Sequence, residues 1–217
     1  MPRSSTPTNY TLNHTPSSDS PMPYQSWSPS TREESQEALV SCLLQILEQP
    51  LAMLRDGTVG DEQMAAESAL IPGSSVGKHL RHVHDHYRLM LDAIEGPSSG
   101  DVIKLDYDKR MRSPPLETSA QSALSEFEET QERIRRLFPR QAPHRMDQRL
   151  ALSATTPAEV ELGSTLGREM WFCCLHAIHH YALARVILTH ELGLAIADSF
   201  GVAPSTIVFR IWGRSKL

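Results

Sequence analysis

The sequence has few of the residues that mark secreted or membrane-spanning proteins. It contains only three cysteines. Two of them, Cys173 and Cys174, are adjacent, so they provide no disulfide framework and favour a reducing compartment. The most apolar stretch, residues 170–188, carries three histidines and an arginine, whereas a membrane span needs about 18 to 20 predominantly apolar residues. We therefore expect a cytoplasmic protein with no membrane segment.

An excess of positive charge is also missing. Lysine and arginine together number 21 against 26 aspartates and glutamates, which gives a formal net charge of −5 at pH 7. The basic residues are dispersed along the chain, and no basic segment is available to follow a phosphate backbone. The composition therefore argues against a nucleic-acid partner.

Residues 1–32 contain almost no aliphatic side chains and are rich in serine, threonine and proline. Such a segment cannot offset its ordering entropy by burying apolar surface. It also lacks the apolar core of a secretory signal. We expect a disordered tail over 1–32 and, from the chain length of 217 residues, one folded domain over 33–217.

Within that domain, apolar residues recur at spacings of three and four, which is the pattern of amphipathic helices. The predicted helices span residues 33–55, 75–95, 118–138 and 164–191. Gly96, Pro139 and Gly193 mark the ends of the last three, and Ser74 and Ser75 are candidate N-caps of the second. Because strands and helices do not alternate along the chain, we predict an all-α four-helix bundle.

The connection between the second and third helices is long. It covers about twenty residues, whereas antiparallel neighbours in a bundle need only a few. It can therefore cross the bundle and make the third helix parallel to the second, in an up-down-down-up order. Residues 146–152 alternate in hydrophobicity and are predicted to form a short strand or an extended edge.

Histidine is concentrated in two short windows. The second predicted helix carries four histidines in eight residues, and the fourth carries three in five. Seven of the ten histidines thus lie at His79, His82, His84, His86, His176, His179 and His180.

An α-helix turns about 100° per residue, so residues three, four or seven apart share a face. His79, His82 and His86 share the face of the second helix that should look inward. His84 points elsewhere, and we expect it to face solvent. On the fourth helix, His176 and His180 form an i, i+4 pair among apolar neighbours.

Several unpaired imidazoles are costly to bury, above all when they are charged. A divalent metal ion resolves this, because neutral imidazole is its commonest nitrogen ligand and two histidines at i, i+4 can bind one ion. A third histidine from a facing helix would leave coordination positions open, as in catalytic sites. Spacing alone does not choose among His79, His82 and His86 for this third ligand.

Three segments resemble a known family. SSVGKHLRHVHDHYRLML and STLGREMWFCCLHAIHHYALARVIL resemble the second-helix and fourth-helix signatures of the DinB-like (DinB/YfiT) superfamily, and YDKRMR resembles a segment of one subgroup. The resemblance covers roughly residues 34–204. It implies a four-helix bundle with a long crossover after the second helix, and a metal-binding triad of His82, His176 and His180.

Other residues are candidates for the substrate. His79 and His86 lie one turn to either side of His82, where they could line the pocket or share a proton network. Arg110 could bind an anionic substrate group, or pair with Asp106 and Asp108 and fix the crossover.

Glu169 is the candidate catalytic residue. It precedes His176 by seven residues and so shares its face, where it could act as a base or orient a ligand ring. The alternative is a carboxylate that stabilises the start of a helix.

The residues and the resemblance together predict a metal-dependent enzyme. A bound divalent ion lowers the pKa of water to about 7 and deprotonates a coordinated thiol. DinB-like proteins include S-transferases and an isomerase that use low-molecular-weight thiols, so the resemblance implies a small-molecule thiol such as glutathione. Zinc, nickel and iron all accept imidazole.

Other functions fit the same pattern. They are metal-assisted hydrolysis, iron-dependent oxygen chemistry, and a non-catalytic metal-binding or dimerising module. Bundles of this size often pair through an exposed helix face, so the sequence leaves a homodimer open as an alternative to a monomer.

Overall fold

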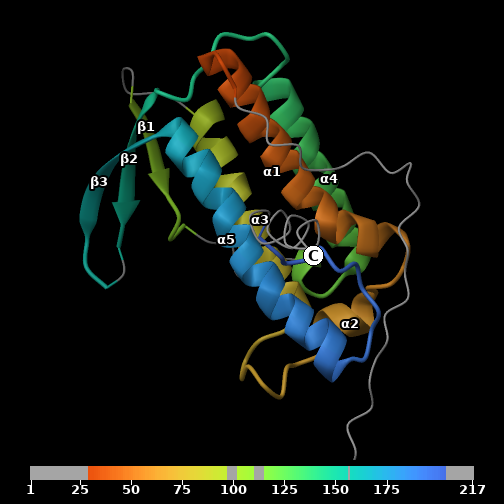
Figure 1. Cartoon of the computed structure of the whole chain (residues 1–217). Coiled ribbons are helices and arrows are strands. Elements are labelled where there is room, and N and C mark those ends of the chain that lie inside the picture. Colours follow the sequence, from red (N-terminus) through yellow and green to blue (C-terminus); the bar gives the residue numbers. More distant parts are fainter. Residues whose placement is uncertain (1–28, 97–101, 110–114, 156, 204–217) are drawn as a thin grey trace, which may run out of the picture.

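The computed structural model describes residues 29–96, 102–109, 115–155 and 157–203, and it is mostly helical (Figure 1). All four predicted long helices are present, and a short one lies between the first two. The α-helices are α1 (Arg32–Arg55), α2 (Asp61–Ala65), α3 (Val76–Glu95), α4 (Ala120–Leu137) and α5 (Leu166–Val186). A 3₁₀ turn, η1 (Pro115–Glu117), precedes α4, and a π-helical turn, η2 (Ile187–Glu191), continues α5. Most of the predicted tail lies outside the described residues.

Side-chain caps set where the long helices begin. The hydroxyl of Thr31 accepts the N–H of Glu34 at 3.1 Å, and the carboxylate of Glu34 accepts the N–H of Thr31 at 3.3 Å, which makes a capping box. Ser75, Ser119 and Thr165 cap α3, α4 and α5 in the same way, each accepting a backbone N–H from the first turn.

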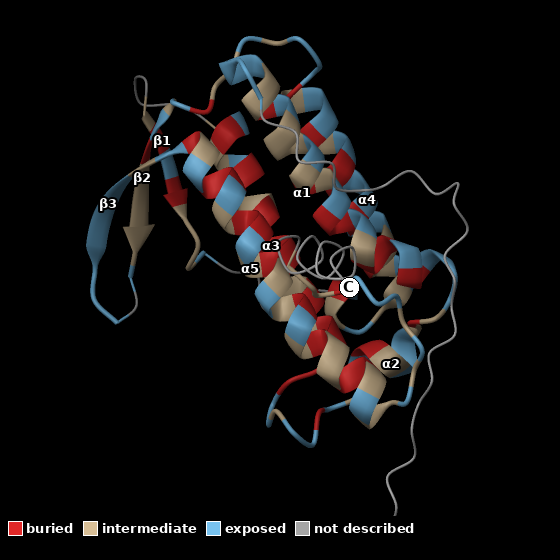
Figure 2. Cartoon of the chain, viewed as in Figure 1, coloured by how far each residue is buried: buried red, intermediate tan, exposed pale blue. Residues whose placement is uncertain are grey.

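The four long helices share one core. α1 contacts α4 and α5, and α3 contacts the same two helices. Their facing sides are buried and their outer sides exposed (Figure 2). Leu47, Tyr87, Phe127 and Tyr181, one from each long helix, are completely buried. The arrangement sets α3 beside α5, so the two helices that carry the histidines are neighbours.

The predicted all-α fold is confirmed in part: the chain is mostly helical, but it also forms a small three-stranded sheet beside the helices (Figure 1). Its strands are β1 (Val102–Asp106), β2 (Arg149–Ala154) and β3 (Val160–Thr165). β2 lies in the middle, parallel to β1 and antiparallel to β3. The predicted extended segment at 146–152 overlaps β2 and is confirmed as a strand.

The sheet forms because the crossover after α3 has apolar residues to bury. Ile103 and Leu105 of β1 are each only 2% exposed, and β1 contacts α3. The backbone of β1 then pairs with β2 from Val102↔Arg149 to Asp106↔Ser153. β3 ends at Thr165, which is also the N-cap of α5. The sheet therefore fixes both the path of the crossover and the start of α5.

Two helical segments are long and apolar enough to cross a membrane, Arg32–Arg55 and Leu166–Glu191. This is weak evidence for a membrane protein, because core helices of soluble proteins pass the same test. Both segments contribute to the core that the long helices share. That the protein lacks a membrane segment stays a prediction.

Gly77 permits the close approach of the crossover to α3. A Cβ at this position would lie 1.8 Å from the carbonyl oxygen of Glu117 and 3.0 Å from that of Met64. Gly77→Ala should therefore destabilise the protein by about 1–3 kcal/mol, although alanine is the better helix former. The free energy of unfolding in urea measures the effect.

Gly163→Ala is the matched control, because a Cβ at Gly163 would have nothing within 4 Å. Its stability should stay within about 0.5 kcal/mol of the unmodified protein. Equal stability of the two variants would contradict the close packing at Gly77.

Candidate metal centre

Three histidines from α3 and α5 converge on one point. His82 comes from α3, and His176 and His180 come from α5. One potential ligand atom of each lies within 4.8 Å of those of the other two. The ring centroid of His82 is 5.0 Å from that of His176 and 4.3 Å from that of His180, and the last two are 4.7 Å apart. Among the described residues, this is the group of three whose geometry could hold a metal ion.

The three rings are neither buried completely nor fully exposed. Phe172, one turn before His176 on α5, stacks on the His176 ring with centroids 5.3 Å apart. Burial, and then the neighbouring rings of His176 and His79, lower the pKa of His180 to about 3. His180 is therefore neutral near pH 7, the state in which an imidazole nitrogen can bind a metal.

This donor set fits a divalent metal ion. Catalytic zinc sites use three protein ligands and keep a fourth position for water or substrate, and three imidazoles also suit iron or nickel. His82, His176 and His180 would hold the ion, and their partial exposure would leave one side for another ligand.

His79 contacts one member of this group, His180. Its Nδ1 is 2.9 Å from the Nδ1 of His180, and its Nε2 is 2.7 Å from the hydroxyl oxygen of Ser74. The residue is 7% exposed. Both ring nitrogens are thus engaged within the protein, which favours an orienting role for His79 over the predicted contact with substrate.

His86 lies against the triad. Its ring centroid is 4.1 Å from that of His176 and 4.6 Å from that of His82, and its other face stacks on Tyr107 at 4.8 Å. The Nδ1 of His86 is 2.9 Å from the carbonyl oxygen of His82. A carbonyl can only accept, so this nitrogen carries a proton. His86 is only 6% exposed, and substrate binding by His86 stays a prediction.

Glu169 is completely buried. One carboxylate oxygen accepts hydrogen bonds from Ser164 at 2.6 Å and from Arg168 at 2.9 Å. The other accepts one from the Tyr107 hydroxyl at 3.1 Å. Three donors therefore occupy the carboxylate. This favours an anchoring role, in which Glu169 ties Tyr107 of the crossover to α5; its predicted catalytic role stays untested.

Cys173 is also buried close to Tyr107, with 3.6 Å between its sulfur and the Tyr107 hydroxyl. Burial raises the pKa of Cys173 and the pKa of Tyr107 well above their usual values. Both groups therefore keep their protons near pH 7, so Cys173 is a protonated thiol beside the triad.

Arg110, predicted to bind substrate, lies outside the residues that the structure describes. Its role in binding an anionic group therefore stays a prediction.

The prediction that His84 faces solvent is wrong. It is only 6% exposed, its ring lies 5.6 Å from that of Phe127, and its Nε2 is 3.5 Å from a carboxylate oxygen of Glu126. Burial lowers its pKa to about 4. α4 covers this face of α3, so His84 is buried away from the triad.

Sequence reasoning missed two residues of the site. Tyr107 stood in a segment noted only for its family resemblance, and Ser74 was considered only as a helix cap. Ser75 caps α3 instead, and the Ser74 hydroxyl turns to His79. No local signal distinguishes these two roles, because they depend on where the crossover and the 66–75 loop meet α5.

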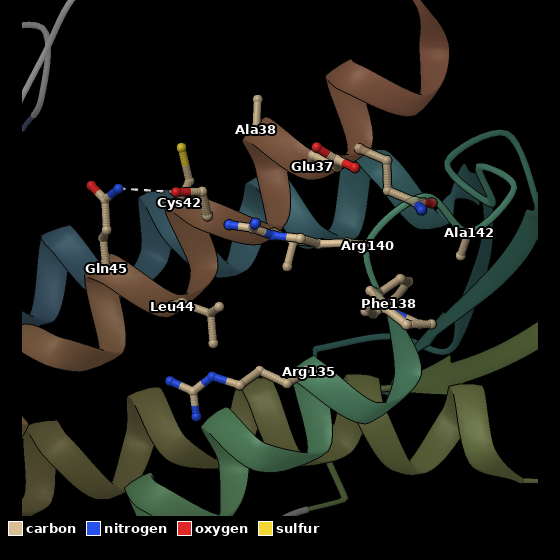
Figure 3. A pocket seen from close by; sticks show the side chains of 13 residues that line it. Glu37, Ala38, Cys42, Leu44, Gln45, Arg135, Phe138, Arg140 and Ala142 are labelled. Atoms are coloured by element: carbon tan, nitrogen blue, oxygen red, sulfur yellow. Dashed lines mark hydrogen bonds between the residues drawn. The ribbon is translucent and has the colours of Figure 1, made fainter.

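A groove of about 820 Å³ lies elsewhere, between α1 and the end of α4 (Figure 3). Arg135, Arg140 and Cys42 are among the residues that line it. No predicted site residue contributes to this groove. We therefore locate the functional site by its convergent imidazoles on α3 and α5 and not by the size of a cavity.

A comparison with protein families gives a match that spans the candidate metal site. The model of the DinB superfamily matches residues 44–184, which is more than half of the chain and includes α3 and all but the last two residues of α5. The chain therefore belongs to the DinB superfamily.

One curated protein is similar in sequence to part of this chain. FK506-binding protein 5 of the fungus Rhizopus delemar is 39% identical over 115 residues, which cover 51% of this chain and 29% of that protein. The chain thus spans less than a third of this relative's length. No solved structure matches the chain significantly.

If the triad binds a metal ion, His180→Ala should abolish stoichiometric binding, because two imidazoles remain and one coordination position loses its protein ligand. Metal content of protein purified without a histidine tag, measured by elemental analysis, checks this. His190→Ala is the matched control, since His190 is exposed in η2 beyond the end of α5. Equal metal content in the two variants would contradict the assignment.

Proposed function

We propose that this member of the DinB superfamily is a metal-dependent enzyme that activates a low-molecular-weight thiol, such as glutathione, for transfer to a small-molecule substrate. The observation that carries the proposal is the convergence of three half-buried histidines whose potential ligand atoms lie within 4.8 Å of one another. The bound ion would be zinc, nickel or iron, and it would lower the pKa of a thiol placed on it.

The protein's own residues would prepare the site for this chemistry. Burial keeps His180 neutral and available as a ligand. The aromatic rings of Phe172 and Tyr107, with centroids 5.5 Å apart, form a wall beside His86 and His176. Such a wall excludes water from one side of a bound molecule and strengthens electrostatic interactions there.

An exposed guanidinium at this wall, that of Arg168, supports a substrate that carries carboxylates. The guanidinium of Arg168 lies 5.1 Å from the centroid of the Phe172 ring. One of its nitrogens bonds to Glu169, while the side chain as a whole is 58% exposed. Glutathione carries two carboxylates, so Arg168 offers a group that could attract it to the aromatic side of the site.

The same triad could instead activate water for hydrolysis or support iron-dependent oxygen chemistry, and a non-catalytic metal-binding module would also use it. Titration of cobalt-substituted protein with glutathione separates thiol activation from these other functions. Thiol binding should produce a thiolate-to-metal absorption band, and S-methylglutathione, which has no free thiol, should produce none.

A bound metal with no change on adding glutathione would reject thiol activation and leave the hydrolase, the oxygen chemistry and the module. Failure of the protein to bind any metal would reject the enzyme functions together.

The proposal also covers the protein's location, its partners, the order of its helices and the pairing of two copies. We expect a cytoplasmic protein with a small-molecule substrate and no nucleic-acid partner. We interpret the ring of contacts among α1, α3, α4 and α5 as a four-helix bundle of up-down-down-up order. Trp171 and Leu175, 50% and 51% exposed on one face of α5, offer a surface through which two copies could pair.

A further inference from the structure

A chain of two contacts leads from the 66–75 loop to the proposed metal site. Ser74 contacts His79, and His79 contacts His180. We propose that His79 is a positioning residue that, together with Ser74, keeps His180 in the tautomer whose Nε2 binds the metal ion. This inference rests on the proposed metal site. It gives His79 the role of orienting a metal ligand and not of binding substrate.

The proton positions follow from the atoms in contact. Two Nδ1 atoms 2.9 Å apart share one proton, because two protons would collide and none would leave two lone pairs facing each other. If His180 keeps this proton, its Nε2 has a lone pair for the metal. His79 then carries its own proton on Nε2 and donates it to Ser74 Oγ, 2.7 Å away.

The opposite arrangement is incompatible with binding through Nε2. If His79 donated to His180, the neutral His180 ring would carry its proton on Nε2 and have no lone pair there for an ion. Ser74 would in that case donate to His79. The Ser74 hydroxyl can serve either tautomer of His79, and when it accepts the Nε2 proton of His79 it stabilises the ligating tautomer of His180.

Burial makes this contact difficult to replace. His79 is 7% exposed and Ser74 is 9% exposed, so bulk water has little access to take the place of either partner. Removing the acceptor leaves the Nδ1 proton of His180 without its hydrogen bond. This raises the free energy of the His180 tautomer that can bind the metal.

The loop that carries Ser74 is tied to the helix that carries His180. The N–H of Ser68 donates to the carbonyl oxygen of Ser74 at 2.9 Å. The Ser68 hydroxyl donates to Glu191 at 2.6 Å, and Glu191 also accepts the N–H of Ala69 at 2.7 Å. Because η2 continues α5, these bonds hold the loop in place relative to His180.

Zinc affinity, measured by competition with a chelator, tests the inference on the full-length chain. His79→Leu removes the acceptor and should weaken zinc binding by about 10- to 100-fold, as expected for a residue that orients a ligand. His79→Gln should recover most of the affinity, because its amide oxygen can accept the Nδ1 proton of His180. Ser74→Ala should fall between the unmodified protein and His79→Leu.

His84→Leu is the matched control, since it removes another buried histidine of α3 that lies outside the site. Its zinc affinity should match that of the unmodified protein. Circular dichroism of each variant verifies that it is folded. An affinity of His79→Leu within about twofold of the His84→Leu value, or no recovery in His79→Gln, would overturn the inference.

Nuclear magnetic resonance gives an independent readout of the tautomer. Long-range ¹H–¹⁵N correlation spectra of the zinc-loaded protein should place the His180 proton on Nδ1 and that of His79 on Nε2. Zinc bound through Nδ1 of His180 would reject the role of His79 while leaving the proposed function intact. Absence of zinc binding by the unmodified protein would reject both.

Discussion

The contact between α3 and α5 is the feature on which the functional account depends. It brings imidazoles from both helices into a space where a charged ring is unfavourable, and burial lowers the pKa of His180 to about 3. A neutral ring keeps a lone pair, and the potential ligand atoms of the three histidines lie within 4.8 Å of one another, close enough to share one ion. The packing that makes His180 costly to charge is therefore what makes it a suitable ligand.

The small sheet contributes to the same site from outside the helices. β1 leads directly to Tyr107, whose ring stacks on His86 and whose hydroxyl bonds to Glu169 of α5. β3 ends at the N-cap of α5. The crossover thus positions an aromatic side chain beside the triad and anchors it to the helix that supplies two of the three candidate ligands.

The sequence predicted the long helices because their signals are local. Caps such as Thr31 and Thr165, and the spacing of apolar residues, act within a few residues of each helix. Helical periodicity also placed His176 and His180 on one face. It could not choose His82 over its neighbours on α3, and that choice came from the family resemblance.

What the sequence could not predict depends on contacts between distant segments. β1 pairs with a strand more than forty residues later, and the all-α prediction did not include this pairing. His84 is buried because α4 covers it, which no pattern within α3 reveals. The role of Ser74 depends likewise on a loop held against the end of α5.

X-ray absorption spectroscopy of zinc-loaded, untagged protein tests the central claim most directly. The account predicts three imidazole nitrogens at about 2.0–2.1 Å from the metal, together with at least one oxygen ligand from solvent in the open position. A first shell that contains sulfur from the protein, or fewer than three imidazoles, would contradict it.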